Sequence, residues 1–146
     1  MIIAVVDGMG GSIGQEIVSQ LRGELGEKAE IMALGTNAIS TGNMMKARAN
    51  RGATGENAIV VSIPEAAVVM GSLSIVVPNS MMGELTPAMA VAIAGSKARK
   101  VLIPLTHPKL DVVGMSVIPL PKLIQEAVSL VKQLLLEGDG GKALEG

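Results

Sequence analysis

Short apolar runs alternate with stretches of helical periodicity along this 146-residue chain. The first run, 2–6, is apolar without alternation, which is typical of a strand that helices cover on both faces. Residues 12–25 then place apolar side chains on one helical face, and a second apolar run follows at 31–34. A strand, a helix and a strand over this distance predict a βαβ unit with a right-handed crossover.

The same alternation continues towards the C-terminus. In the middle of the chain we expect a helix capped by Ser40 or Thr41 over 40–50, a helix or a strand over 58–63, a buried strand at 67–70 and a strand or short helix at 73–77. Further on we expect a helix from Thr86-Pro87 to Gly95, a strand at 101–105, a short strand at 112–117 and a helix over 121–137.

Alternating buried strands and amphipathic helices predict an α/β fold. We expect one Rossmann-like three-layer domain over 1–137, with a mostly parallel sheet and flanking helices, followed by a flexible C-terminal tail at 138–146.

A glycine-rich stretch joins the first strand to the first helix. Gly8, Gly10 and Gly14 follow the pattern G-x-G-x-x-x-G, and Gly11 is an additional glycine. Small residues here let backbone N–H groups approach phosphate oxygens, and the helix N-terminus adds partial positive charge. The alternative is a tight turn whose glycines supply only positive φ. Because a strand precedes and a helix follows, the context favours an anion or nucleotide site. Its expected residues are Gly8, Met9, Gly10, Gly11, Ser12, Ile13 and Gly14.

The dinucleotide fingerprint is incomplete after the second strand. An acidic residue there would bind the ribose hydroxyls, but this strand ends at Leu34-Gly35-Thr36-Asn37. Thr36 and Asn37 can hydrogen-bond a ribose or a 2′-phosphate with less discrimination. The case for NAD is therefore weaker, and NADP, a mononucleotide or another phosphorylated metabolite stays open. No Gly-Lys-Ser/Thr follows the turn, so a Walker-type loop is excluded.

Later polar residues are expected at the same sheet edge, because ligands bind at the carboxyl ends of parallel strands. Asn79 and Glu84 follow one apolar run, and His107 follows another. His107 is the single histidine, and no partner for catalysis is identifiable. Arg51 and Thr54 form a second candidate anion site, which competes with an ordinary solvated helix end.

Asp7 lies in the turn itself, where a carboxylate repels phosphate unless it bonds backbone N–H groups or a sugar hydroxyl. We expect Asp7 to fix the turn. No carboxylate cluster has the spacing of metal ligands, so we expect no metal site.

Composition narrows the function classes. The chain has no Cys, Phe, Tyr or Trp, has 10 Met, and carries a net charge of −1. Disulfides and Cys-based metal sites are therefore excluded, and neither a basic footprint nor a stacking platform for nucleic acid exists. No stretch predicts a membrane span or a signal peptide. We expect a cytoplasmic protein with no nucleic-acid or membrane partner and, from its 49% apolar residues, a homo-oligomer, taken as a dimer.

Three segments resemble a known family: DGMGGSIG, ALGTNAISTGNMMKARANRGATGENAIVV and VPNSMMGELTPAMA. Together they resemble an uncharacterised bacterial Rossmann-like family, domain of unknown function 3842, over the chain up to about Leu110. The resemblance implies a bacterial Rossmann-like protein and supplies no catalytic residues.

No acid–base pair or nucleophile can be assembled from the sequence. We therefore expect a protein that binds a nucleotide, either NADP-like or a mononucleotide, or a small phosphorylated metabolite through the glycine-rich stretch. One alternative is a small NAD(P)-dependent oxidoreductase, or a subunit of one. The other is an oligomeric scaffold without a ligand.

Overall fold

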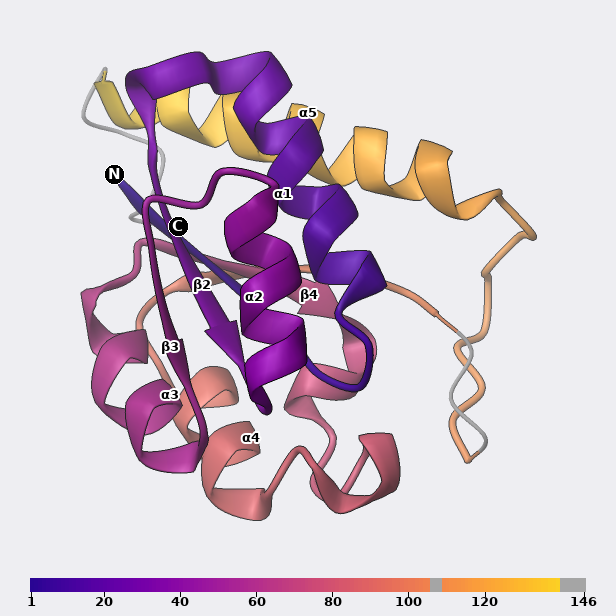
Figure 1. Cartoon of the computed structure of the whole chain (residues 1–146). Coiled ribbons are helices and arrows are strands. Elements are labelled where there is room, and N and C mark those ends of the chain that lie inside the picture. The colour runs from indigo at the N-terminus through magenta and orange to yellow at the C-terminus, as the bar shows by residue number, and fades with distance from the viewer. Residues whose placement is uncertain (106–108, 140–146) are drawn as a thin grey trace.

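A computed structural model describes residues 1–105 and 109–139 (Figure 1). Within these ranges five strands form one parallel sheet in the order β3-β2-β1-β4-β5. The strands are β1 (Ile2–Asp7), β2 (Glu30–Gly35), β3 (Arg51–Thr54), β4 (Val68–Ser72) and β5 (Arg99–Ile103). The α-helices are α1 (Ser12–Leu25), α2 (Ala38–Lys46), α3 (Glu56–Ser62), α4 (Pro87–Ala94) and α5 (Leu120–Asp139). Short 3-10 turns are η1 (Gly26–Lys28), η2 (Ile63–Glu65), η3 (Leu73–Val76) and η4 (Met81–Gly83).

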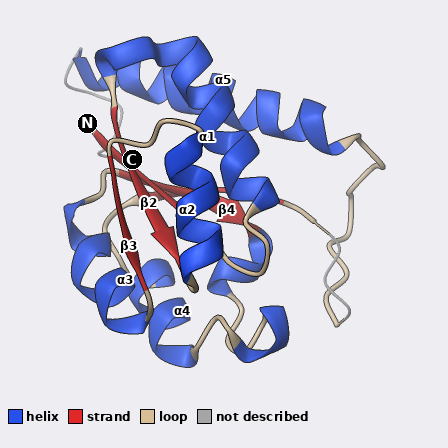
Figure 2. Ribbon diagram, in the orientation of Figure 1, coloured by secondary structure: helices blue, strands red, loops and turns tan. Residues whose placement is uncertain are grey.

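Helices cover both faces of the sheet, so the domain has three layers (Figure 2). Helices α1, α2 and α5 enclose one core with Ile3 and Val5 of β1. Helices α3 and α4 enclose the other core with Ala4 and Val6. Alternate side chains of a strand point to opposite faces, so the apolar run of β1 supplies both cores. The expected α/β class and parallel sheet are confirmed.

The order of the strands creates a switch point between β1 and β4. From β1 the chain adds β2 and β3 on one side, then crosses over and adds β4 and β5 on the other. The connections that leave β1 and β4 therefore run to opposite faces of the sheet. In open α/β sheets, ligands bind in the crevice that this divergence leaves at the carboxyl ends of the strands.

Strand β3 was not expected from the sequence. Its residues read RGAT and are mostly exposed, so a hydrophobic run is absent. As an edge strand beside β2, it needs little apolar surface. Thr54 lies within this strand, and α3 begins after Gly55, whose φ is 100°. Thr54 therefore ends β3 and does not cap α3, whose N-cap is Gly55.

Helix α2 begins earlier and ends sooner than its expected span of 40–50. Its N-cap is Asn37, whose Oδ1 accepts a hydrogen bond from the backbone N–H of Ser40 at 2.9 Å. Ser40 and Thr41 are thus inside the helix rather than at its cap. The helix stops at Lys46, and Arg48 has a φ of 79°.

The structure also decides the elements that the sequence left open between helix and strand. Residues 58–63 belong mainly to helix α3, and 73–77 mainly to the turn η3. The helix start at Thr86 is confirmed, since its Oγ1 accepts from the Met89 N–H at 3.3 Å. Residues 112–117 form no strand and are exposed. Helix α5 extends to Asp139 instead of ending at 137; the rest of the expected tail, 140–146, lies outside the described residues.

Candidate functional site

A cavity of about 230 Å³ opens at the switch point, at the carboxyl ends of β1 and β4. Its walls come from the loop and helix start after β1, from the segment after β4, and from the end of the β5 region. The lining residues are Asp7, Gly8, Met9, Gly10, Gly11, Ser12, Ile13, Ser72, Ser74, Met81 and Leu105.

Asp7 fixes the turn after β1, as expected. Its buried carboxylate accepts hydrogen bonds from the backbone N–H groups of Gly8 at 2.8 Å and Gly14 at 2.7 Å. The carboxylate therefore joins the end of β1 to the first turn of α1, where N–H groups lack helical acceptors. Burial raises the pKa of Asp7 against the effect of these hydrogen bonds, and the negative charge of Glu84 adds to the rise.

The glycines of the loop at 8–14, which we call the glycine loop, differ in why they are glycine. A Cβ on Gly8 would lie 2.6 Å from Thr36 Oγ1, and one on Gly14 would lie 2.6 Å from Met44 Sδ. Gly11 has a φ of 75°, and a Cβ on this residue would clash with Ser40. A Cβ on Gly10 would meet nothing within 4 Å, and Gly10 has no positive φ. The protein's own packing thus requires three of these glycines but not Gly10.

Helix α2 orients the glycine loop through two asparagines. Asn37 Nδ2 donates to the carbonyl of Met9 at 2.9 Å, and Asn43 Nδ2 donates to the carbonyl of Gly10 at 2.7 Å. The Met9–Gly10 peptide is trans, so its N–H points opposite to its carbonyl and away from α2.

Several polar groups that line the cavity have no hydrogen-bond partner among the described residues. The hydroxyls of Ser12, Ser72 and Ser74 make no hydrogen bond with the described part of the chain, and the same holds for the backbone N–H groups of Gly10 and Ser12. Ser72 is buried at the end of β4. The sequence-based expectation did not include Ser72 and Ser74; their only signal was small polar residues at the end of an apolar strand.

Glu84 reaches the glycine loop from the segment before α4. Its Oε1 accepts hydrogen bonds from Thr36 Oγ1 at 2.6 Å, Asn37 Nδ2 at 2.8 Å and the Met9 N–H at 2.9 Å. These donors lower the pKa of Glu84, the Thr36 hydroxyl most strongly. A carboxylate therefore does stand at the end of β2, although the sequence of that strand supplies none.

The other expected site residues lie in different places. Asn79 is exposed with a φ of 63° and does not line the cavity. Arg51 and Thr54 begin and end β3, so they lie at opposite ends of the strand. Arg51 contacts Glu30 at 3.2 Å and Glu65 at 3.3 Å, whereas the hydroxyl of Thr54 contacts that of Thr41. His107 lies outside the described residues.

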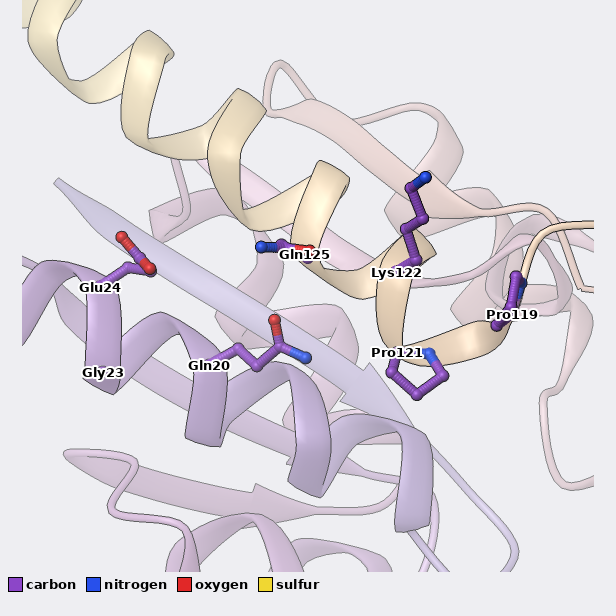
Figure 3. A pocket seen from close by; sticks show the side chains of 7 residues that line it. All are labelled: Gln20, Gly23, Glu24, Pro119, Pro121, Lys122 and Gln125. Carbon is purple, nitrogen blue, oxygen red and sulfur yellow. The ribbon is translucent and has the colours of Figure 1, made fainter.

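A second hollow lies between α1 and the start of α5, as Figure 3 shows. It measures about 690 Å³ and is an open groove lined by Gln20, Gly23, Glu24, Pro119, Pro121, Lys122 and Gln125. Nearly all of these residues are exposed, and Glu24 and Lys122 carry opposite charges. The groove therefore has surface character and holds no buried polar group aimed at a ligand.

Residues 1–105 and 109–139 offer neither a metal site built from acidic, His or Cys side chains nor a membrane-spanning helix. They contain no group of three or more His, Cys, Asp or Glu placed to hold a metal ion. Their helices also include none with the length and apolar character needed to cross a membrane.

Comparisons with known proteins place the chain in a family without adding a ligand. A family model with the description "Domain of unknown function (DUF3842)" matches residues 2–136. No curated protein and no solved structure matches the chain.

Proposed function

We propose a function for this chain, which belongs to the family Domain of unknown function (DUF3842), from the geometry of its site. The glycine loop binds a nucleotide or another phosphorylated metabolite in the crevice between β1 and β4. The observation that carries this proposal is Gly10. Neither backbone conformation nor neighbouring atoms require a glycine there, and Gly10 lines the cavity. At such a loop, a glycine lets the backbone approach a phosphate.

The donors at the cavity suit a phosphate group. The N–H groups of Gly10 and Ser12 have no acceptor among the described residues, and Ser12 begins α1, whose N-terminus carries partial positive charge. Ser72 and Ser74, whose hydroxyls have no hydrogen-bond partner among the described residues, line the same cavity. The oxygens of a bound phosphate can accept hydrogen bonds from groups of these kinds.

The charge of Asp7 opposes an anion, and the fold reduces that opposition. Both carboxylate oxygens accept backbone N–H groups on the α1 side of the turn. Burial also raises the pKa of Asp7, which lowers the cost of its protonated form. A bound phosphate would shift that equilibrium further towards the proton-bound carboxyl.

Titration calorimetry with purified protein tests this function. The titrants are inorganic phosphate, ribose 5-phosphate, AMP, GTP and NADP⁺. We expect saturable 1:1 binding of at least one of them, lost in Gly10→Asp because the substitution adds bulk and negative charge to the lining of the cavity.

Gly23→Asp is the matched control, because a Cβ at Gly23 also meets nothing within 4 Å but lies on α1 away from the cavity. We expect this variant to bind like the wild type. Absence of binding by all titrants, or equal binding by Gly10→Asp, would overturn the proposed function.

A further inference from the structure

A short segment between β4 and α4 lies across the glycine loop. We call residues 79–84 the strap. Backbone hydrogen bonds from Asn79 to Leu85 and from Leu85 to Ser80 close its base, and Ser80 Oγ donates to the carbonyl of Ser74 at 2.6 Å. Ser80 and Leu85 are buried, so the base is anchored, whereas Met82 at the tip is 92% exposed.

The strap rests directly on the loop. A Cβ on Gly8 would lie 2.7 Å from Met81 Sδ and 3.1 Å from Glu84 Oε1. The Met9 N–H, a donor of the loop, is already bound to Glu84. On this side the loop therefore contacts the strap, and Met81 of the strap lines the cavity together with Ser72 and Ser74.

The strap also forms hydrogen bonds with the polar groups at the end of β2. Thr36 Oγ1 and Asn37 Nδ2 both donate to the same atom, Glu84 Oε1. In dinucleotide sites of this fold, the end of β2 binds the ribose hydroxyls. Here Glu84, a side chain of the protein itself, occupies the end of β2 where those hydroxyls would bind.

The backbone of the strap is held in an uncommon conformation. Asn79, Met81 and Met82 have φ values of 63°, 57° and 57°, and Gly83 has 89°. Left-handed φ disfavours residues with a Cβ, so such a run persists only where contacts hold it in place. The three hydrogen bonds to Glu84 Oε1 are contacts of this kind, and they make Glu84 the latch of the strap.

We propose that the strap makes this site selective for a small phosphomonoester, such as a sugar phosphate, and excludes dinucleotides. This inference rests on the proposed function. The phosphate meets Gly10 and Ser12 in a cavity of about 230 Å³, below the roughly 300–1,000 Å³ of pockets that enclose drug-sized ligands. A dinucleotide needs the end of β2 as well, and Glu84 occupies it.

Paired titrations of ribose 5-phosphate and NADP⁺ test the inference on the full chain. The wild type binds ribose 5-phosphate and binds NADP⁺ at least about tenfold more weakly. In Glu84→Ala the latch is lost, and NADP⁺ binding tightens by about tenfold or more while ribose 5-phosphate binding stays within about threefold.

Glu84→Gln is the matched control, because its amide oxygen can still accept the three hydrogen bonds; it should exclude NADP⁺ like the wild type. Thr36→Val, which removes one donor to the latch, provides a second, milder opening if Glu84→Ala does not fold. It should shift NADP⁺ binding in the same direction.

Two outcomes overturn the inference and leave the proposed function standing. One is wild-type binding of NADP⁺ as tight as that of ribose 5-phosphate, with loss in Glu84→Ala, since Glu84 would then bind the ribose. The other is ribose 5-phosphate binding with no gain for NADP⁺ in either opened variant. If neither titrant binds any of these proteins, the inference fails, and the proposed function fails with it only if inorganic phosphate, AMP and GTP do not bind either.

Discussion

Gly8 and Gly10 are two residues apart and differ in what keeps each of them a glycine. The space beside Gly8 is filled by Thr36, Met81 and Glu84, so its missing side chain serves contacts within the protein. The space beside Gly10 is empty. A pattern of glycines in a sequence therefore mixes two causes, and a glycine of the second kind points to a ligand only where it also lines a cavity, as Gly10 does and Gly23 does not.

Alanine substitutions separate these two causes. Gly8→Ala forces Thr36 Oγ1 and Met81 Sδ away from the loop, and overpacking of this kind lowers the free energy of unfolding by about 1–3 kcal/mol. Gly10→Ala should change it by less than about 0.5 kcal/mol. Urea denaturation of both variants measures the difference, and equal destabilisation would contradict the assignment.

The two carboxylates of the site should titrate in opposite directions. The pKa of Asp7 is raised above its usual 3.8, and that of Glu84 is lowered below its usual 4.5. Carboxyl ¹³C NMR titration measures both. In Glu84→Gln the pKa of Asp7 should fall, because a nearby negative charge is gone; an unchanged Asp7 would contradict the interaction between them.

These shifts have opposite consequences for stability. The stabilising effect of a protonated Asp7 is fully present below pH 3.8 and is lost as pH rises through its raised pKa. The stabilising effect of an ionised Glu84 is present above pH 4.5 and is lost as pH falls through its lowered pKa.

At the scale of elements, a buried arginine holds α1 against the segment between α2 and β3. Arg22 is 4% exposed. Its guanidinium donates to the carbonyls of Gly26 at 2.7 Å, Ala29 at 3.4 Å and Arg48 at 2.8 Å, and to Asn50 Oδ1 at 2.7 Å. Its charge is thus balanced by three backbone carbonyls, by the amide oxygen of Asn50 and by the exposed carboxylate of Glu27 at 3.9 Å.

Replacing this arginine should destabilise the fold. Arg22→Met keeps much of the apolar stem but leaves the carbonyls of Gly26 and Arg48 without their donor, which costs about 1.5–3 kcal/mol of the free energy of unfolding. The exposed Lys28→Met is the control, with an expected change below about 0.5 kcal/mol. A loss no larger than that of the control, measured by urea denaturation, would contradict this account.

The elements that the sequence predicted are those whose signal is local. Buried strands such as β1 are continuous apolar runs, and the start of α4 is marked by Thr86 and Pro87. Strand β3 was not predicted, because an exposed edge strand needs no apolar pattern in its sequence. Glu84 was expected at the correct sheet edge, but its contact with Met9 joins residues 75 apart in the chain and depends on how the strap folds back. Local patterns carry no information about such a contact.

For the whole molecule, the order of the strands decides where a ligand can bind. The connections after β1 and β4 diverge, and the cavity lies where they part. The larger groove between α1 and α5 lies away from this point and is lined by exposed side chains (Figure 3). We therefore assign the ligand to the cavity at the switch point because of the strand order, although the groove between α1 and α5 is larger.

The homo-oligomer expected from the apolar composition stays a prediction. Static light scattering at several protein concentrations measures it, and we expect twice the mass of one chain. A mass equal to one chain at all concentrations would contradict the expected dimer.

Amide NMR mapping of the full chain during titration with ribose 5-phosphate tests whether the ligand binds at the glycine loop. We expect the largest shifts on Gly10, Ser12, Ser72 and Ser74, and unchanged amide signals of Lys122 and Gln125 beside the second groove. Saturating shifts confined to that groove, or no shift at the glycine loop, would contradict this expectation.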